Sequence, residues 1–282
     1  MKQFLVFVCF ALLIACKKDA TDNDQPLVAQ TLLNISYGND AFQKMDVYLP
    51  AGRSTDSTRL IVLVHGGAWL TGDKSDFTGY VPTLQQRLPG YAVANINYRL
   101  ATTTANHFPA QENDMKAAVD FLTQKSGEYH ISRKLVLLGA SSGGHLAALQ
   151  AYKYSDPAIK AVVDFYGPAD MAALYDNATD PLVKSYIQTL MGGTPATNPM
   201  LYQQSSPVNF VSAQSPPTII LHGASDELVN INQSTVLKDR LQSAGVVNQL
   251  IIYPDQGHDI WPSSIMNDAF DKIEVFIKAN VE

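Results

Sequence analysis

Apolar runs and amphipathic stretches alternate along most of this chain, from about Thr31 to the C-terminus. Eight apolar runs are predicted to be strands: residues 31–37, 45–49, 60–65, 91–97, 134–140, 160–166, 217–222 and 248–253. The later runs are apolar without interruption, which is typical of strands that are buried on both faces of a parallel sheet. The pattern therefore predicts a sheet that lies inside the molecule.

The stretches between these runs have the spacing of helices. One predicted helix carries Met115, Ala118, Val119 and Leu122 on a single face, and another near the C-terminus carries a stripe of Met266, Ala269, Phe270, Ile273, Phe276 and Ile277. Strands that alternate with helices predict an α/β fold, with a mainly parallel eight-stranded sheet covered by helices on both faces. Ligands of such sheets bind at the carboxyl ends of the strands.

The N-terminus has the pattern of a targeting segment. Lys2 is followed by an apolar run over residues 4–15, and the next charge is Lys17. The run is too short to span a bilayer and suits the hydrophobic region of a signal peptide. It ends in Leu-Ile-Ala-Cys16, which resembles the lipobox of bacterial lipoproteins. The resemblance implies cleavage before Cys16 and lipidation of that cysteine; the alternative is an ordinary signal peptide with an incidental cysteine.

This reading divides the chain into three parts. Residues 1–15 are a lipoprotein signal peptide, residues 16–30 are the lipidated cysteine with a polar, flexible tether, and residues 31–282 are one α/β domain. We expect an exported bacterial lipoprotein of the cell envelope, in the periplasm or on the outer-membrane surface, that contacts the membrane through its lipid only.

Composition excludes several classes of function. The net charge is −6 and no block of Lys and Arg occurs, so we expect no nucleic-acid partner. Both cysteines, Cys9 and Cys16, lie in the targeting segment, which leaves the domain without a disulfide, a thiolate metal site or a cysteine nucleophile. No zinc-binding, phosphate-binding or dinucleotide-binding motif occurs, so we expect neither a metal nor a cofactor. Composition leaves the oligomeric state open.

A candidate nucleophile follows the strand predicted at 134–140. The segment Gly139-Ala140-Ser141-Ser142-Gly143-Gly144 contains G-x-S-x-G between a strand and a helix. A serine on such a sharp turn needs very small neighbours two residues before and after it. Ser141 has glycine at both places, whereas Ser142 has Ala140 and Gly144. We therefore predict Ser141 as the nucleophile, with Ser142 as the competing choice.

A candidate oxyanion hole follows the strand predicted at 60–65. His65-Gly66-Gly67-Ala68-Trp69 offers backbone N–H groups, and its glycines let the backbone approach a developing oxyanion closely. We predict that the N–H groups of Gly67 and Ser142 bind the oxyanion, with Gly66 or Ala68 as the third donor. His65 is expected to orient this loop.

Two further residues complete a possible catalytic set. Asp226 follows the strand predicted at 217–222, and His258 follows the last predicted strand. The order Ser, Asp, His is the one associated with α/β-hydrolases, so His258 is predicted to be the base and Asp226 to hold it. Asp255 and Asp259 flank the histidine too closely to reach its ring nitrogen.

These motifs together resemble the α/β-hydrolase superfamily, and within it the esterase/lipase group with an HGGxW oxyanion loop. This group includes feruloyl- and acetyl-esterase-like enzymes and kynurenine formamidases. The resemblance rests on HGGAW at 65–69, NYR at 97–99, GASSGGHLA at 139–147 and HGASDELV at 222–229, and it runs from about Ile35 to the C-terminus. Ser142 departs from the alanine that is usual in the group, and we expect it to add a polar group beside the oxyanion. Arg99 and Asp114 are expected to form a structural ion pair.

A long segment separates two predicted core strands. Residues 167–215 include a helical pattern, PLVKSYIQTLM, and connections of this length are usually functional. By resemblance this segment is a cap that shapes the acyl or alcohol pocket; the alternative is a surface excursion that only covers the sheet.

The resemblance implies a serine hydrolase that cleaves carboxylic esters through an acyl-enzyme intermediate. An exported lipoprotein suggests small-molecule or polysaccharide-linked substrates, with short acyl, acetyl or feruloyl groups. An amidase similar to kynurenine formamidase is the alternative enzyme. A binding module that keeps the fold without catalysis is the alternative from another class.

Overall fold

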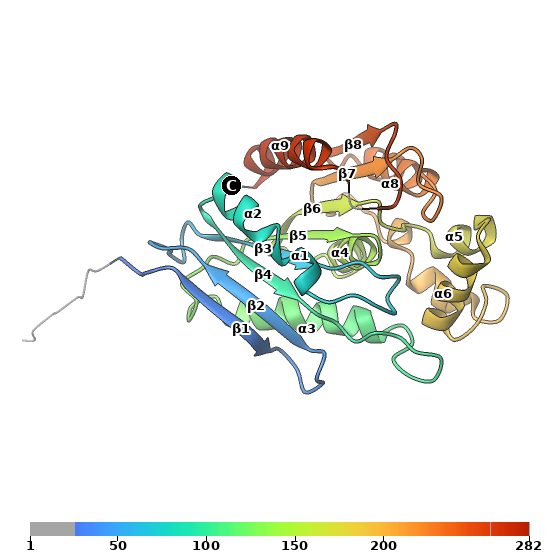
Figure 1. The fold of residues 1–282 in the computed structure, drawn as a ribbon, viewed down its shortest axis with the longest axis horizontal. Helices are drawn as coiled ribbons and strands as arrows, with labels where there is room; N and C mark the ends of the chain where they lie inside the picture. The colour runs from blue at the N-terminus through green and yellow to red at the C-terminus, as the bar shows by residue number, and fades with distance from the viewer. Residues whose placement is uncertain (1–25, 260, 282) are drawn as a thin grey trace, which may run out of the picture.

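A computed structural model of the protein describes residues 26–259 and 261–281, and Figure 1 shows its arrangement. In this part of the chain the strands are β1 (Gln30–Ser36), β2 (Lys44–Leu49), β3 (Arg59–Val64), β4 (Tyr91–Ile96), β5 (Leu135–Ala140), β6 (Ile159–Phe165), β7 (Thr218–Gly223) and β8 (Asn248–Tyr253). The helices are α1 (Ser75–Thr78), α2 (Val81–Arg87), α3 (Ala110–Gln124), α4 (Ser142–Lys153), α5 (Met171–Asn177), α6 (Pro181–Met191), α7 (Pro199–Gln204), the 3-10 turn η1 (Pro207–Asn209), α8 (Asn232–Ser243) and α9 (Ser263–Asn280).

All the strands belong to one eight-stranded sheet in the order β1-β2-β4-β3-β5-β6-β7-β8. β2 runs antiparallel to both of its neighbours, and every other pair is parallel. The predicted fold class, a mainly parallel eight-stranded sheet, is confirmed, and each predicted strand lies within a residue or two of an observed one.

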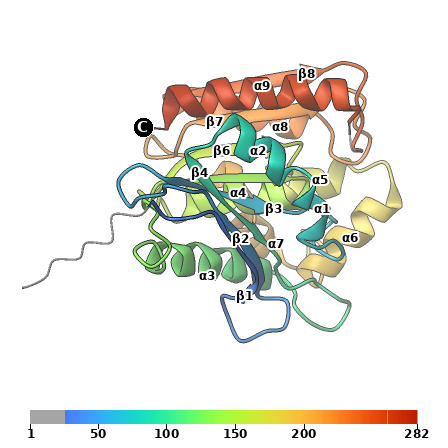
Figure 2. The same cartoon turned by 60° about the vertical axis from the view of Figure 1, so that its left-hand side comes forward.

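The sheet divides the hydrophobic core into two layers because successive side chains of a strand point to opposite faces. On β3, Val62 belongs to the layer that packs under α3, α4 and α8, whereas Leu63 belongs to the layer under α2 and α9. In Figure 2 the strands lie between α9 and α3, which belong to different layers. A central strand therefore needs apolar side chains on both of its faces, which explains the uninterrupted apolar runs in the sequence.

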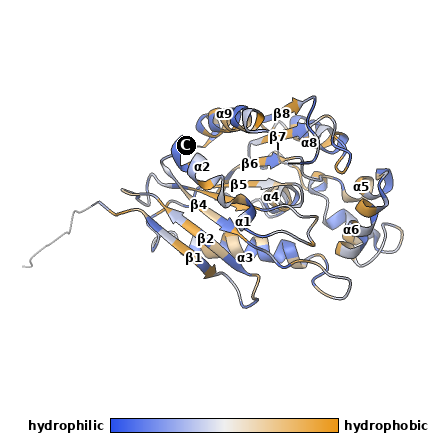
Figure 3. Ribbon diagram, viewed as in Figure 1, coloured by the Kyte–Doolittle hydropathy of each residue, from blue (hydrophilic) through white to orange (hydrophobic). Residues whose placement is uncertain are grey.

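The C-terminal helix illustrates how the sequence positions a covering element. α9 buries Ala269, Phe270, Ile273, Phe276 and Ile277, which recur at the spacing of one helix face. Hydrophobic and hydrophilic residues lie side by side along this helix (Figure 3). The predicted stripe is thus the face that packs against β6 and β7.

The segment 167–215 forms α5, α6, α7 and η1, and Figure 1 shows α5 and α6 beyond the carboxyl ends of the central strands. α6 coincides with the predicted helical pattern PLVKSYIQTLM; it starts at Pro181 behind the Asp180 cap and ends at Gly192, which adopts the left-handed conformation. In the described residues, no helix is both long and apolar enough to cross a membrane.

Candidate active site

Ser141 lies on a strained turn between β5 and α4, which we call the elbow. Its φ is +54° and its ψ is −123°, a conformation that is unfavourable for a residue with a side chain. A Cβ atom on Gly139 would lie 2.2 Å from the carbonyl oxygen of Gly143, and one on Gly143 would lie 2.0 Å from that of Val64. The two glycines are therefore required by close backbone approach, and the turn sets the Ser141 hydroxyl at the N-terminus of a twelve-residue helix.

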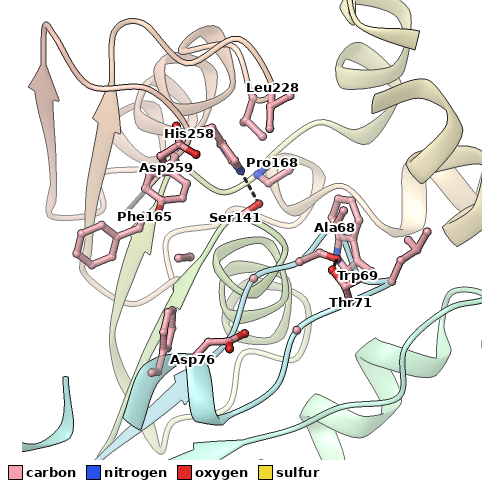
Figure 4. A pocket seen from close by; sticks show the side chains of 18 of the residues that line it. Ala68, Trp69, Thr71, Asp76, Ser141, Phe165, Pro168, Leu228, His258 and Asp259 are labelled. Carbon is pink, nitrogen blue, oxygen red and sulfur yellow. Dashed lines mark hydrogen bonds between the residues drawn. The ribbon is translucent and has the colours of Figure 1, made fainter. Parts of the chain in front are cut away.

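The structure brings Ser141, His258 and Asp226 together. His258 Nε2 lies 2.8 Å from the Ser141 hydroxyl, and His258 Nδ1 lies 2.7 Å from Asp226 Oδ2. Figure 4 shows the imidazole directed at the Ser141 hydroxyl, which lies in the cleft. Because the carboxylate can only accept, Nδ1 carries the proton and Nε2 is left to accept the proton of the hydroxyl.

The Asp226 side chain is fully buried and surrounded by donors. Burial raises the pKa of its carboxyl, but hydrogen bonds from His222 and His258 and from the backbone N–H of Val229 outweigh burial and bring the pKa to about 2. The N–H groups of Leu228 and Val229 donate to Asp226 Oδ1 at 2.9 and 2.8 Å. The carboxylate is therefore ionised and fixed in one orientation at neutral pH.

The predicted oxyanion loop has an unusual backbone. Gly67, Ala68 and Trp69 have φ values of +112°, +53° and +63°, so three successive residues lie in or near the left-handed region. The N–H groups of Leu70 and Thr71 both donate to the carbonyl of Gly67, at 3.0 and 2.9 Å. This tight turn leaves Gly66, Gly67 and Ala68 lining the same cleft as Ser141.

The cleft around Ser141 has a volume of about 830 Å³ and is mainly apolar. Figure 4 shows Phe165 and Asp259 on one side of Ser141 and Ala68, Trp69 and Thr71 on the other. The helices α5 and α6 also contribute to the wall, with Leu174, Val183, Tyr186 and Ile187. The segment 167–215 thus contributes side chains to the wall of the cleft.

Comparison with known proteins agrees with this geometry. The family model described as BD-FAE matches residues 45–241, which is more than two thirds of the chain. The chain belongs to the BD-FAE family. The predicted membership of the α/β-hydrolase superfamily and of its esterase group is thereby confirmed.

Individual relatives support the same grouping. The chain is 30% identical over 244 residues to a Mycobacterium tuberculosis protein named "Probable carboxylic ester hydrolase LipM", covering 79% of this chain and 54% of that protein. A solved truncated form of a carbohydrate esterase from gut microbiota superposes with a TM-score of 0.73 at 26% identity, covering 88% of this chain and 97% of that one. Kynurenine formamidase of Danio rerio matches a shorter stretch, 36% identical over 130 residues, covering 43% of this chain and 39% of that one. The chain spans about half the length of the LipM protein.

One expectation for this BD-FAE chain is wrong. Ser142 was expected to add a polar side chain beside the oxyanion, but its residue is fully buried and its hydroxyl lies 3.2 Å from that of Tyr98. The Tyr98 hydroxyl also donates to the carbonyl of His65 at 3.0 Å. The Ser142 side chain therefore does not line the cleft, and only the backbone N–H remains as a candidate oxyanion donor.

Buried contacts fix His65 and the loop that follows it. The imidazole of His65 is fully buried, stacks on the Tyr98 ring at a centroid distance of 4.3 Å, and its Nδ1 lies 2.7 Å from the carbonyl of Gly66. Burial lowers the pKa of His65 and favours its neutral form. These contacts support the predicted role of His65 in orienting the loop.

The sequence did not reveal a buried bridge between three segments. Trp69 Nε1 donates to His145 Nδ1 at 3.1 Å, and His145 Nε2 lies 2.7 Å from the carbonyl of Ser205. Burial lowers the pKa of His145 to about 4, so the ring is neutral with its proton on Nε2. The bridge connects the oxyanion loop to α4, which follows the elbow, and to the segment 167–215. The sequence signal that could have predicted it is the tryptophan of HGGAW together with the histidine of GGHLA.

Two other expectations concern polar groups. Arg99 and Asp114 form the predicted ion pair, with Nη2 and Oδ1 2.6 Å apart and the carboxylate fully buried. Within residues 26–259 and 261–281, no three His, Cys, Asp or Glu side chains are grouped so that they could bind a metal ion. Cys16 and the rest of the predicted signal peptide lie outside the described residues.

Proposed function

We propose that this protein is a serine hydrolase that cleaves carboxylic esters, with Ser141 as nucleophile, His258 as base and Asp226 as the group that holds the base. The observation that carries the proposal is the unbroken chain of hydrogen bonds from the Ser141 hydroxyl through His258 to Asp226, at 2.8 and 2.7 Å. Ser141 and His258 line an apolar cleft, and the strained elbow and the glycine-rich loop lie beside it.

Acylation follows from this geometry. His258 Nε2 takes the proton of the Ser141 hydroxyl while the oxygen attacks the ester carbonyl. The carbonyl oxygen becomes an oxyanion, which the N–H groups of Gly67 and Ser142, with Gly66 or Ala68 as third donor, stabilise. Asp226 stabilises the imidazolium that has formed. Collapse of the tetrahedral intermediate breaks the ester C–O bond, and the leaving alcohol takes the proton from Nε2.

Deacylation repeats these steps with water. Nε2 removes a proton from a water molecule that attacks the acyl carbonyl, and the same N–H groups stabilise the second oxyanion. Collapse returns the proton to the Ser141 oxygen and releases the carboxylic acid. Each of these steps uses only Ser141, His258, Asp226, the oxyanion donors and water.

For the substrate we propose small-molecule or polysaccharide-linked esters, with short acyl or carbohydrate-linked acetyl or feruloyl groups. The similarity to a carbohydrate esterase over nearly all of that solved chain supports this class. An amidase activity has weaker support, because kynurenine formamidase matches less than half of this chain. The complete hydrogen-bonded set argues against a module that only binds.

Hydrolysis of p-nitrophenyl acetate tests the proposal. We expect the wild-type protein to release p-nitrophenol, the Ser141→Ala variant to lose this activity, and the Ser142→Ala variant to keep a substantial fraction. The reverse pattern would show that Ser142 is the nucleophile. No turnover, together with no labelling by a fluorophosphonate probe, would favour the binding module.

We also propose that the protein is an exported lipoprotein anchored through Cys16. The apolar run over residues 4–15 and the lipobox-like sequence that ends at Cys16 support this proposal. Expression of the full chain in a bacterium that processes lipoproteins tests it: the wild type is expected in the membrane fraction, and the Cys16→Ser variant in the soluble fraction. Equal membrane fractionation of the two would contradict the anchor.

A further inference from the structure

The cleft extends beyond Ser141 into the hydrophobic core. Besides the residues of the oxyanion loop and of α5 and α6, its wall contains side chains of the core layer between the sheet and α2 and α9. We call this part the core lobe; it is lined by Leu63, Leu84, Leu138, Phe165, Met266 and Phe270. The core lobe lies on the side of Ser141 where Figure 4 labels Phe165.

The walls of the core lobe are deeply placed. Leu63, Leu138 and Phe165 come from the adjacent strands β3, β5 and β6, and they are only 1%, 4% and 5% exposed. Phe270 of α9 and Leu84 of α2, at 5% and 2% exposed, face them from the covering helices. These residues line the cleft where it meets the core layer.

The charge pattern of the cleft fits an apolar guest. Its charged lining residues are Asp76 and Asp259, both exposed to solvent, and no Lys or Arg contributes to the described wall. A charged group pushed into the core lobe would lose its water and find no partner of opposite charge there. An alkyl chain or a phenyl ring would lose only unfavourable contact with water.

We propose that the core lobe binds an apolar arm of the ester, an alkyl chain or a ring of several carbons, and that Met266 determines which arms fit. This inference rests on the proposed ester hydrolysis and deepens it. An acetyl group leaves the core lobe empty, so a longer arm gains binding energy that acetate cannot. Burial of each methylene is expected to raise kcat/KM about fourfold, which corresponds to about 0.8 kcal/mol, until the core lobe is full.

Met266 is suited to this role by its place. It lies in the first turns of α9 and is half-buried, whereas the other helix residues of the core lobe are buried in the core. Its side chain is unbranched and flexible and packs at the edge of the core layer, so a change in its size alters the core lobe. The next residue, Asn267, is exposed and does not line the cleft, which makes it a matched control.

Two series of esters test the inference. One varies the acyl arm, from p-nitrophenyl acetate through butyrate to hexanoate; the other varies the alcohol arm, from ethyl through butyl to hexyl acetate. We expect kcat/KM to rise about fourfold per methylene in at least one series. The Met266→Trp variant is expected to lower the ratio of longest to shortest ester at least tenfold in that series, which identifies the arm that the core lobe holds.

Two control variants complete the design. Asn267→Trp adds the same bulk one residue away and is expected to leave both ratios within twofold of wild type. Met266→Ala is expected to shift the optimum to longer arms, and it supplies the test if the tryptophan variant does not fold. Flat series in the wild type, or ratios that respond equally to Met266→Trp and Asn267→Trp, would overturn the inference. Turnover of acetate in that case would leave the proposed esterase intact, whereas loss of turnover for every ester would contradict both.

Discussion

The bridge from Trp69 to His145 allows a sharp prediction for the substitution Trp69→Phe. Phenylalanine keeps an aromatic ring in the core but removes the N–H that donates to His145 Nδ1 at 3.1 Å. Both residues are buried, with exposures of 3% and 0%. Water therefore cannot replace the lost donor without opening the core, and the acceptor stays without a partner.

The size of the effect follows from that burial. A buried acceptor without a partner costs about 1–3 kcal/mol, so we expect the free energy of unfolding of the variant to fall by about that amount. For a protein of this size each 1 kcal/mol lowers Tm by about 2–4 °C. The variant also loses the hydrogen bond that holds the oxyanion loop. Ala68 and residue 69 have an unfavourable positive φ, which costs about 1–2 kcal/mol per residue, so the loop has a reason to rearrange once that bond is gone.

This release is expected to act on catalysis as well as on stability. The oxyanion donors are expected to lose their fixed positions. Removal of one such donor lowers kcat by about 10²-fold, so we expect a decrease in kcat that approaches this value, with a smaller change in KM. Urea unfolding followed by the fluorescence of the remaining Trp261, and kcat and KM for p-nitrophenyl acetate, measure the two effects. Stability within 0.5 kcal/mol of wild type, taking about 1 kcal/mol as the least expected loss, together with an unchanged kcat would refute the reasoning.

Three further outcomes are expected. Asp226→Asn presents a donor in place of an acceptor to His258 Nδ1 and is expected to lower kcat by about 10⁴-fold with a small effect on KM; a loss below tenfold, about 1.4 kcal/mol, would contradict the role of the carboxylate. Burial raises the pKa of Asp164 from 3.8 to about 6, so the folded protein favours the protonated carboxyl. This preference stabilises the fold fully below about pH 3.8, and the stabilisation is lost as the pH rises through about 6. Denaturant unfolding measures this: between acidic and alkaline pH, the free energy of unfolding of Asp164→Asn is expected to rise by about 3 kcal/mol relative to that of the wild type. Parallel pH profiles of the two proteins would contradict this expectation. Gly143→Ala places a Cβ 2.0 Å from the carbonyl oxygen of Val64 and is expected to abolish ester turnover or folding, whereas the control Gly127→Ala meets nothing within 4 Å; equal activities would show that the elbow tolerates a side chain.

The strands could be predicted from sequence because burial on both faces leaves an unambiguous apolar run. The hydrophobic alternation does not, however, carry the direction of a strand, so the reversed β2 was not anticipated. The short helices α1 and α2 also gave no clear signal. α1 has only four residues and buries none of them, and Pro82 follows the first residue of α2.

The candidate site could be predicted as far as local rules reach. Ser141 was distinguishable from Ser142 because steric demands on neighbouring residues are written in the sequence itself. The direction of the Ser142 side chain and the contact between Trp69 and His145 depend on how α4 sits against the loop after β3, which is a tertiary matter. The core lobe is likewise invisible in sequence, since its residues satisfy the same apolar pattern as the rest of the core.

The central claim is that the hydroxyl of Ser141 attacks the substrate with His258 as its base. Treatment with diethyl p-nitrophenyl phosphate followed by mass spectrometry of the peptides tests it most directly, because an activated serine displaces p-nitrophenolate and forms a stable phosphoryl adduct, whereas an ordinary serine does not react. We predict one diethylphosphoryl group per chain, located on Ser141 in fragment spectra, and none on the His258→Ala variant. A protein that stays unmodified, or an adduct located on Ser142, would contradict the account.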